Sequence, residues 1–132
     1  MESKKRYVVN ESQAVTGKLP VPGGGGIFRI LIDRESTGAQ HFSLLVNEVR
    51  PGYKSKEHSH DVEHCWYILQ GKGVMHIEGE ALPIGVGDAV FAPIGVKHTV
   101  ESTGEVPLKY VVIYAPSGPE QDLKKQTGFA QS

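Results

Sequence analysis

Histidine side chains are concentrated in one short stretch of this chain. Three of its six histidines, His58, His60 and His64, fall within seven residues, and His98 follows a turn-rich segment further along. Imidazole nitrogen is a common ligand of zinc, copper, iron, nickel and manganese, and several neutral imidazoles must converge to hold one ion. The pattern predicts a metal site formed by His58, His60, His64 and His98.

Strand alternation indicates how these side chains converge. Alternate residues of an extended chain point to one side, so His58 and His60 face the same way, and His64, an even number of residues later, can share that face. A single strand cannot close a site, so another ligand must come from elsewhere, and His98 opens the segment 98–102. The competing interpretation is a solvated loop, because the residues before His58 are polar.

The first histidine segment resembles the first motif of the cupin superfamily. That motif is Gly, five residues, His-x-His, three or four residues, Glu, six residues, Gly, and here Gly52, His58, His60 and Gly71 match it. His64 stands where the family usually has Glu. This change implies a four-histidine ligand set in place of three histidines and a carboxylate.

The second histidine segment resembles the second cupin motif. That motif is Gly, five residues, Pro-x-Gly, two residues, His, three residues, Asn; Gly87, Pro93, Gly95 and His98 match, and Ser102 replaces the Asn. The resemblance covers residues 40–116 and implies an all-β fold, a cupin-type double-stranded β-helix or jelly-roll barrel. The four-histidine set resembles a subgroup of single-domain cupins that includes manganese- or iron-binding oxygenase-like proteins and a zinc-dependent polyketide cyclase.

Four neutral ligands would leave the charge of a divalent ion uncompensated, so the site should attract anions. A six-coordinate ion would also keep two adjacent positions free for a keto-enolate, a carboxylate, or a substrate oxygen with dioxygen. We expect no catalytic residues beyond the metal ligands, with Tyr110 or Tyr114 able to reach the cavity. Glu57, Glu63 and Glu78 are interpreted as surface carboxylates.

Three functions follow from this site. The first is an enzyme that uses manganese or iron for oxygenase-type chemistry on a small enol, aromatic or carboxylate substrate. The second is a non-redox cyclase, isomerase or lyase with zinc or nickel. The third is a non-enzymatic module that binds a small molecule, and a metal-free storage protein ranks below it.

Strand patterns predict which residues line the pocket. Runs typical of strands occur at 7–9, 27–32, 42–49, 66–69, 74–77, 88–93 and 106–114. The short Gly71-Lys72-Gly73 connection favours a hairpin in which Gln70 pairs with Gly73. On this register the residues that share the His64 side, and with Phe91 form the pocket lining, are Trp66, Ile68, Met75 and Ile77. Tyr67 and His76 point away, and His41 and His76 are predicted non-ligands.

Length and composition fit a single domain over residues 1–132. We expect N-terminal strands and a flexible glycine-rich loop in 1–39, the barrel core in 40–116, and a loose or partner-bound polar tail in 117–132. Sixteen Gly, eight Pro and 39% hydrophobic residues indicate short strands and tight turns.

Charge and cysteine content bound the partners. A net charge of −1 and short apolar runs indicate neither nucleic-acid nor membrane binding, and the N-terminus lacks the pattern of a signal peptide, so a cytoplasmic location is expected. Cys65, the only cysteine, is interpreted as a small packed residue. Resemblance to small cupins implies a homodimer formed through residues 1–32.

Overall fold

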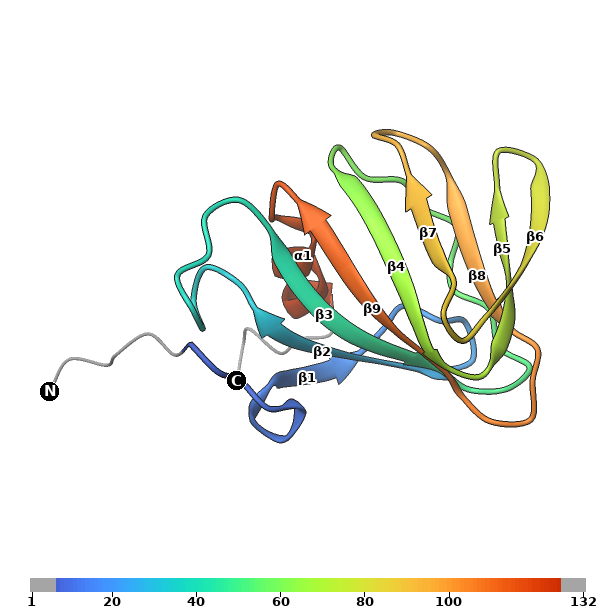
Figure 1. Ribbon diagram of the computed structural model, residues 1–132, viewed down its shortest axis with the longest axis horizontal. Coiled ribbons are helices and arrows are strands. Elements are labelled where there is room, and N and C mark those ends of the chain that lie inside the picture. The colour runs from blue at the N-terminus through green and yellow to red at the C-terminus, as the bar shows by residue number, and fades with distance from the viewer. Residues whose placement is uncertain (1–6, 127–132) are drawn as a thin grey trace, which may run out of the picture.

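Two antiparallel β-sheets enclose the core of the protein. The computed structural model describes residues 7–126. Figure 1 shows the strands of the two sheets side by side in one curved arrangement. The larger sheet has the order β1 (Val15–Lys18), β2 (Gly26–Ile32), β3 (Ser43–Val49), β9 (Leu108–Ala115), β4 (Glu63–Gln70), β7 (Ala89–Ala92). The smaller sheet has the order β6 (Glu80–Gly85), β5 (Lys72–Ile77), β8 (His98–Ser102). A 3-10 turn, η1 (Glu11–Gln13), precedes β1, and a helix, α1 (Pro119–Gln126), follows β9. This is the all-β jelly-roll arrangement that the sequence predicted.

Strict alternation along β9 shows how the sheets share one core. Leu108, Tyr110, Val112 and Tyr114 are buried and the residues between them are half-exposed. Because neighbouring strands keep inward residues in rows, Val112 lies between Leu45 of β3 and Trp66 of β4. Met75, Ile77 and Val100 of the smaller sheet belong to the same buried cluster. The apolar face of each sheet is therefore buried against the other.

The predicted hairpin between residues 66–69 and 74–77 is wrong. β4 pairs with β7 and β9, whereas β5 pairs with β6 and β8, so the Gly71–Gly73 connection carries the chain from one sheet to the other. A Cβ at Gly71 would lie 2.7 Å from the Pro107 carbonyl oxygen, and one at Gly73 would lie 2.3 Å from that of Glu101. These glycines allow close backbone approach at a crossover. Alternation within each strand still buries the four residues predicted to face inward.

The N-terminal region also differs from expectation. Residues 7–9 form no strand, and β1 and β6 are strands that the sequence reasoning missed. The glycine-rich loop was expected to be flexible, but Tyr53 packs against it. A Cβ at Gly25 would lie 2.4 Å from Cγ of Tyr53, so glycine is required where the ring sits. Residues 1–6 of the predicted dimer segment lie outside the described residues, and the homodimer stays a prediction.

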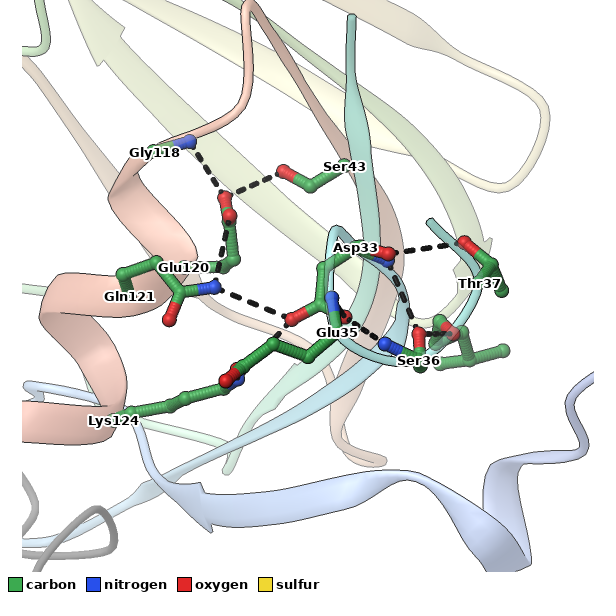
Figure 2. A network of polar contacts seen from close by, with 10 residues as sticks. Asp33, Glu35, Ser36, Thr37, Ser43, Gly118, Glu120, Gln121 and Lys124 are labelled. Atoms are coloured by element: carbon green, nitrogen blue, oxygen red, sulfur yellow. Dashed lines mark hydrogen bonds and ion pairs between the residues drawn. The ribbon is translucent and has the colours of Figure 1, made fainter. Parts of the chain in front are cut away.

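The expectation of a loose tail is wrong for residues 119–126, which form α1. Two charged side chains of this helix are buried: Glu120 is 0% and Lys124 is 8% exposed. Glu120 accepts hydrogen bonds from the Ser43 hydroxyl at 2.7 Å and from the Gly118 amide at 2.9 Å (Figure 2). Residues 127–132 lie outside the described residues. No helix in the described part of the chain is long and apolar enough to cross a membrane.

A second set of contacts joins α1 to the connection between β2 and β3. Lys124 Nζ donates to Asp33 Oδ2 at 3.1 Å and also contacts Glu35, and Gln121 donates to the same Asp33 oxygen (Figure 2). Burial by itself raises the pKa of Asp33, but hydrogen bonds from Ser36 and Lys124 lower it, and the net pKa lies below the ordinary value. The helix is thus attached to the sheet by an ion pair that solvent hardly reaches.

We predict that Lys124→Met lowers the free energy of unfolding by about 3 kcal/mol, because the Asp33 carboxylate stays buried without its cation. Urea unfolding measures this, with Lys125→Met, at the exposed neighbouring lysine, as the control expected to change it by less than about 0.5 kcal/mol. The depressed pKa of Asp33 means that the stabilisation is present above its unfolded value and is lost as pH falls through the folded value. The deficit of Lys124→Met should therefore shrink in acid. Equal effects of the two variants at neutral pH would contradict the role of this ion pair.

Candidate metal centre

The four candidate ligands come from three different parts of the fold. His64 lies on β4 of the larger sheet, His98 begins β8 of the smaller sheet, and His58 and His60 lie on the connection between β3 and β4. His58 and His98 exchange backbone hydrogen bonds of 3.2 Å and 2.9 Å, and the Gly95 amide donates to the His60 carbonyl at 2.8 Å. Backbone pairing therefore fixes where these side chains start.

Three of the imidazoles form a compact cluster. One ring nitrogen from each of His58, His60 and His98 lies within 4.8 Å of the others, and the two Nε2 atoms of His58 and His98 are 3.2 Å apart. Two nitrogens bonded at about 2.0–2.1 Å to one ion lie about 3–4 Å apart, a separation that the His58–His98 pair already has and that the third imidazole would reach by a small movement of its ring. The spacing of the cluster therefore fits a transition-metal ion.

Backbone carbonyls orient two of the rings. His58 Nδ1 lies 2.6 Å from the Lys56 carbonyl oxygen and His98 Nδ1 lies 3.1 Å from that of Val96. A carbonyl can only accept, so each Nδ1 carries the proton and each neutral ring presents the lone pair of Nε2. Metal-ligating histidines are commonly oriented in this way. Two lone pairs that face each other at 3.2 Å repel, and a cation between them would turn this repulsion into ligation.

His64 lies beside the cluster but outside it. Its ring centroid is 5.0 Å from that of His98 and 5.2 Å from that of His60, and it stacks on Trp66 at 3.8 Å. Both its ring nitrogens, and Nε2 of His60, are buried without a hydrogen-bond partner among the described residues. Burying unpaired polar atoms is costly unless something satisfies them. The orphaned nitrogens fit a metal ion, and ligation by His64 itself stays a prediction.

Burial keeps these imidazoles neutral. Loss of solvation lowers the pKa of His60 and of His98 to about 4, and repulsion from His58 is the next largest cause in both. Burial also lowers the pKa of His58, and lowers that of His64 further, where the nearby His98 adds to the effect. Neutral imidazole is the form that binds metals. Near pH 7 the cluster therefore presents lone pairs.

A cavity of about 330 Å³ opens from the histidine cluster. The residues that line it besides the four histidines are Leu19, Pro20, Asn47, Ser55, Lys56, Glu57, Ser59, Trp66, Val100, Tyr110, Val112, Tyr114, Pro119, Asp122 and Leu123. Two segments outside the central strands contribute to this wall, the turn after β1 and the start of α1. Helix α1, which Figure 1 shows behind β3 and β9, thus forms part of the binding site as well as part of the core.

The predicted pocket lining is partly corrected. Trp66 borders the cavity, whereas Ile68, Met75 and Ile77 are buried in the core away from it. The inward placement of Phe91 is wrong, because its side chain is 56% exposed. Phe91 pairs with Cys65 on β4 and so shares the outer face, while the next residue of β7 points inward.

Tyr110 and Tyr114 both border the cavity, because residues four apart on one strand share a face. Glu57 is exposed at the cavity edge, and Glu63 and Glu78 are exposed. His76 lies outside the cluster.

The two predicted non-ligands, His41 and His76, and the cysteine lie away from the cluster. His76 Nε2 is 2.9 Å from the Glu101 carboxylate, and His41 is exposed. Cys65 lies outside the cavity lining, and burial raises the pKa of its thiol. Asn47, Asp122 and Leu123 are among the lining residues that the sequence reasoning missed. Only Asn47 gave a signal, as a polar residue in an apolar strand.

Comparison with known proteins agrees with the fold and the motif. Residues 45–114 match the family model described as the cupin domain. The chain belongs to the cupin family. It is 30% identical, over 83% of its length and 74% of the relative's, to the tetracenomycin polyketide synthase protein TcmJ of Streptomyces glaucescens.

Solved cupin structures superpose closely. A Thermotoga maritima protein described as a predicted oxalate decarboxylase has a TM-score of 0.73 at 26% identity, covering 83% of this cupin and 99% of that chain. The polyketide cyclase RemF of Streptomyces resistomycificus has a TM-score of 0.73 at 24% identity, covering 86% and 82%. The second likeness concerns the fold alone. Metal binding by this cupin accords with its three-histidine cluster.

We predict that His98→Ala weakens divalent-metal binding by at least about 10–100-fold. Metal affinity already falls by about this factor when a residue that only hydrogen-bonds to a metal ligand is removed. Elemental mass spectrometry on untagged protein, together with a zinc titration, measures this. His64→Ala tests the fourth ligand: reduced affinity is expected because its ring nitrogens have no hydrogen-bond partner in the described part of the chain. The matched control is His76→Ala, which should bind metal like the wild type. Unchanged metal binding in His98→Ala would contradict the site.

Proposed function

We propose that this cupin is a metal-dependent enzyme that acts on a small oxygenated molecule, an enol, an aromatic compound or a carboxylate. The metal would be held by His58, His60, His64 and His98. The observation that carries the proposal is the pair of Nε2 lone pairs 3.2 Å apart at the end of a cavity large enough for a small organic molecule. Bound there, a divalent ion supplies Lewis acidity, and manganese or iron also supplies redox chemistry.

The walls of the cavity favour a flat, partly apolar ligand. Trp66 stacks on His64, and the Tyr114 ring lies 4.5 Å from the same imidazole, so aromatic surfaces border the metal position. Burial raises the pKa of Tyr114, which keeps its hydroxyl protonated and able to donate a hydrogen bond. Val100 and Val112 continue the apolar wall. These residues would orient a ligand and exclude water from it.

Proton transfer by a buried carboxylate has little support. Among the described residues that line the cavity, carboxylates occur only at exposed positions, Glu57 and Asp122. Charge that develops on a bound enol or carboxylate would therefore be stabilised chiefly by the uncompensated cation. An anionic ligand suits a site with neutral protein ligands.

Two chemistries remain open for this site. Oxygenase-type chemistry with manganese or iron follows from the four-histidine resemblance. Non-redox cyclisation, isomerisation or lyase chemistry with zinc or nickel is favoured by the similarity to a polyketide synthase protein over 83% of the chain. A ligand set made only of nitrogen also binds nickel, copper and zinc more tightly than manganese or iron. We therefore place the two chemistries on an equal footing.

We predict that benzoylacetone, a chelating aromatic diketone, binds metal-loaded protein as its enolate, giving a shift of its near-ultraviolet absorption. Metal-free protein and metal-depleted His98→Ala should give no shift. Anaerobic and aerobic incubations with manganese-, iron- and zinc-loaded protein then separate the chemistries. Loss of the diketone together with dissolved oxygen supports the oxygenase, and loss without oxygen supports the non-redox enzyme. An identical spectrum with metal-free protein would contradict a metal-centred site.

A further inference from the structure

Asn47 is a buried polar residue that the metal site does not explain. It lies on β3 on the same face as the buried Leu45 and Val49, is 3% exposed, and lines the cavity. It lies directly opposite Tyr110 of β9, and its proximity partly offsets the rise that burial causes in the Tyr110 pKa. Among the described residues, however, its Oδ1 has no partner. A buried amide oxygen without a partner costs stability, so its presence needs a reason.

Strand register places Asn47 at the end of the cavity remote from the metal. Tyr114 pairs with His64, whereas Tyr110, four residues earlier on β9, pairs with Asn47. At about 3.3 Å per residue, the two rows are about 13 Å apart along the strands. The cavity therefore has a metal-binding end and a separate polar end.

The segment between the two ends is apolar. Trp66 and Val112 form the intervening row of the larger sheet, and Val100 faces them from the smaller sheet. Hydrophobic walls with a few well-placed polar groups are typical of small-molecule sites, in which the polar groups fix orientation. A ligand that filled this space would need an apolar middle and hydrogen-bonding groups at both ends.

We propose that Asn47 is a specificity-determining residue that hydrogen-bonds to a polar group, such as a hydroxyl, at the end of the ligand remote from its metal-chelating oxygens. The inference rests on the proposed function and narrows its substrate class to elongated, largely aromatic molecules that carry oxygen at both ends. The unpartnered Oδ1 accepts from a ligand hydroxyl. A ligand without the distal group leaves the amide unsatisfied and binds more weakly.

Two hydroxamic acids that differ by one hydroxyl test this inference. Biphenyl-4-carbohydroxamic acid and its 4′-hydroxy derivative share a chelating head and an apolar body, and only the derivative carries the distal group. Zinc-loaded protein avoids redox reactions, and calorimetry gives both dissociation constants. We expect the hydroxyl to tighten binding to the wild type about tenfold, as one neutral hydrogen bond within a buried site does.

Variants at Asn47 isolate the amide. In Asn47→Leu, which keeps the volume, and in Asn47→Ala, which leaves space, the affinity ratio of the two compounds should fall to about one. The matched control is Gln70→Leu, an exposed amide on β4 outside the cavity, and it should keep the wild-type ratio. Melting temperature and zinc content verify that each variant is folded and loaded.

The outcomes separate this inference from the proposed function. A wild-type ratio near one, or a ratio that survives both Asn47 variants, overturns the role of Asn47 and leaves the metal site intact. If each compound binds zinc-free wild type as tightly as it binds zinc-loaded wild type, the metal-centred function is overturned instead. Loss of the ratio only in the Asn47 variants, with zinc-dependent binding throughout, is the expected result.

Discussion

The structure depends on holding four uncharged imidazoles close together at one end of the cavity. Nε2 of His58 and Nε2 of His98 face each other at 3.2 Å, and both rings are fixed by carbonyls that accept from the opposite nitrogens. Such an arrangement is unfavourable by itself, since it gathers lone pairs that repel one another and buries ring nitrogens of His60 and His64 that have no partner among the described residues. The jelly roll supports it by pairing the backbone of His58, on the connection between β3 and β4, with that of His98 at the start of β8, so the rings cannot easily move apart.

Part of this centre could be predicted from local sequence, and part only from the family resemblance. Strand alternation, which acts over a few residues, predicts that His58 and His60 share a face, whereas the approach of His98 was implied by the resemblance to the paired cupin motifs. The structure brings these three together and places His64 beside them. Inward-facing residues within single strands, such as Trp66 and Met75, were also predicted correctly.

What the sequence did not reveal depends on contacts between distant segments. The sheet switch at Gly71 looked like a hairpin, since a short glycine-rich connection serves both, and only the approach of the Pro107 carbonyl distinguishes them. The binding of α1 was missed for a similar reason. A polar C-terminal segment gives no apolar stripe, and its attachment comes from the Lys124 ion pair with Asp33, 91 residues earlier.

The metal ligands and part of the cavity wall come from different segments of the chain, and this has an evolutionary consequence. The predicted metal ligands all lie within the 45–114 cupin match, whereas Leu19, Pro20, Pro119 and Leu123 of the cavity wall lie outside it. Mutations in these flanking segments can reshape the wall while the histidine cluster keeps its backbone pairing. Descendants of one ancestral barrel can therefore diverge in the molecules they accept by changing the flanks, with the inherited metal chemistry left untouched.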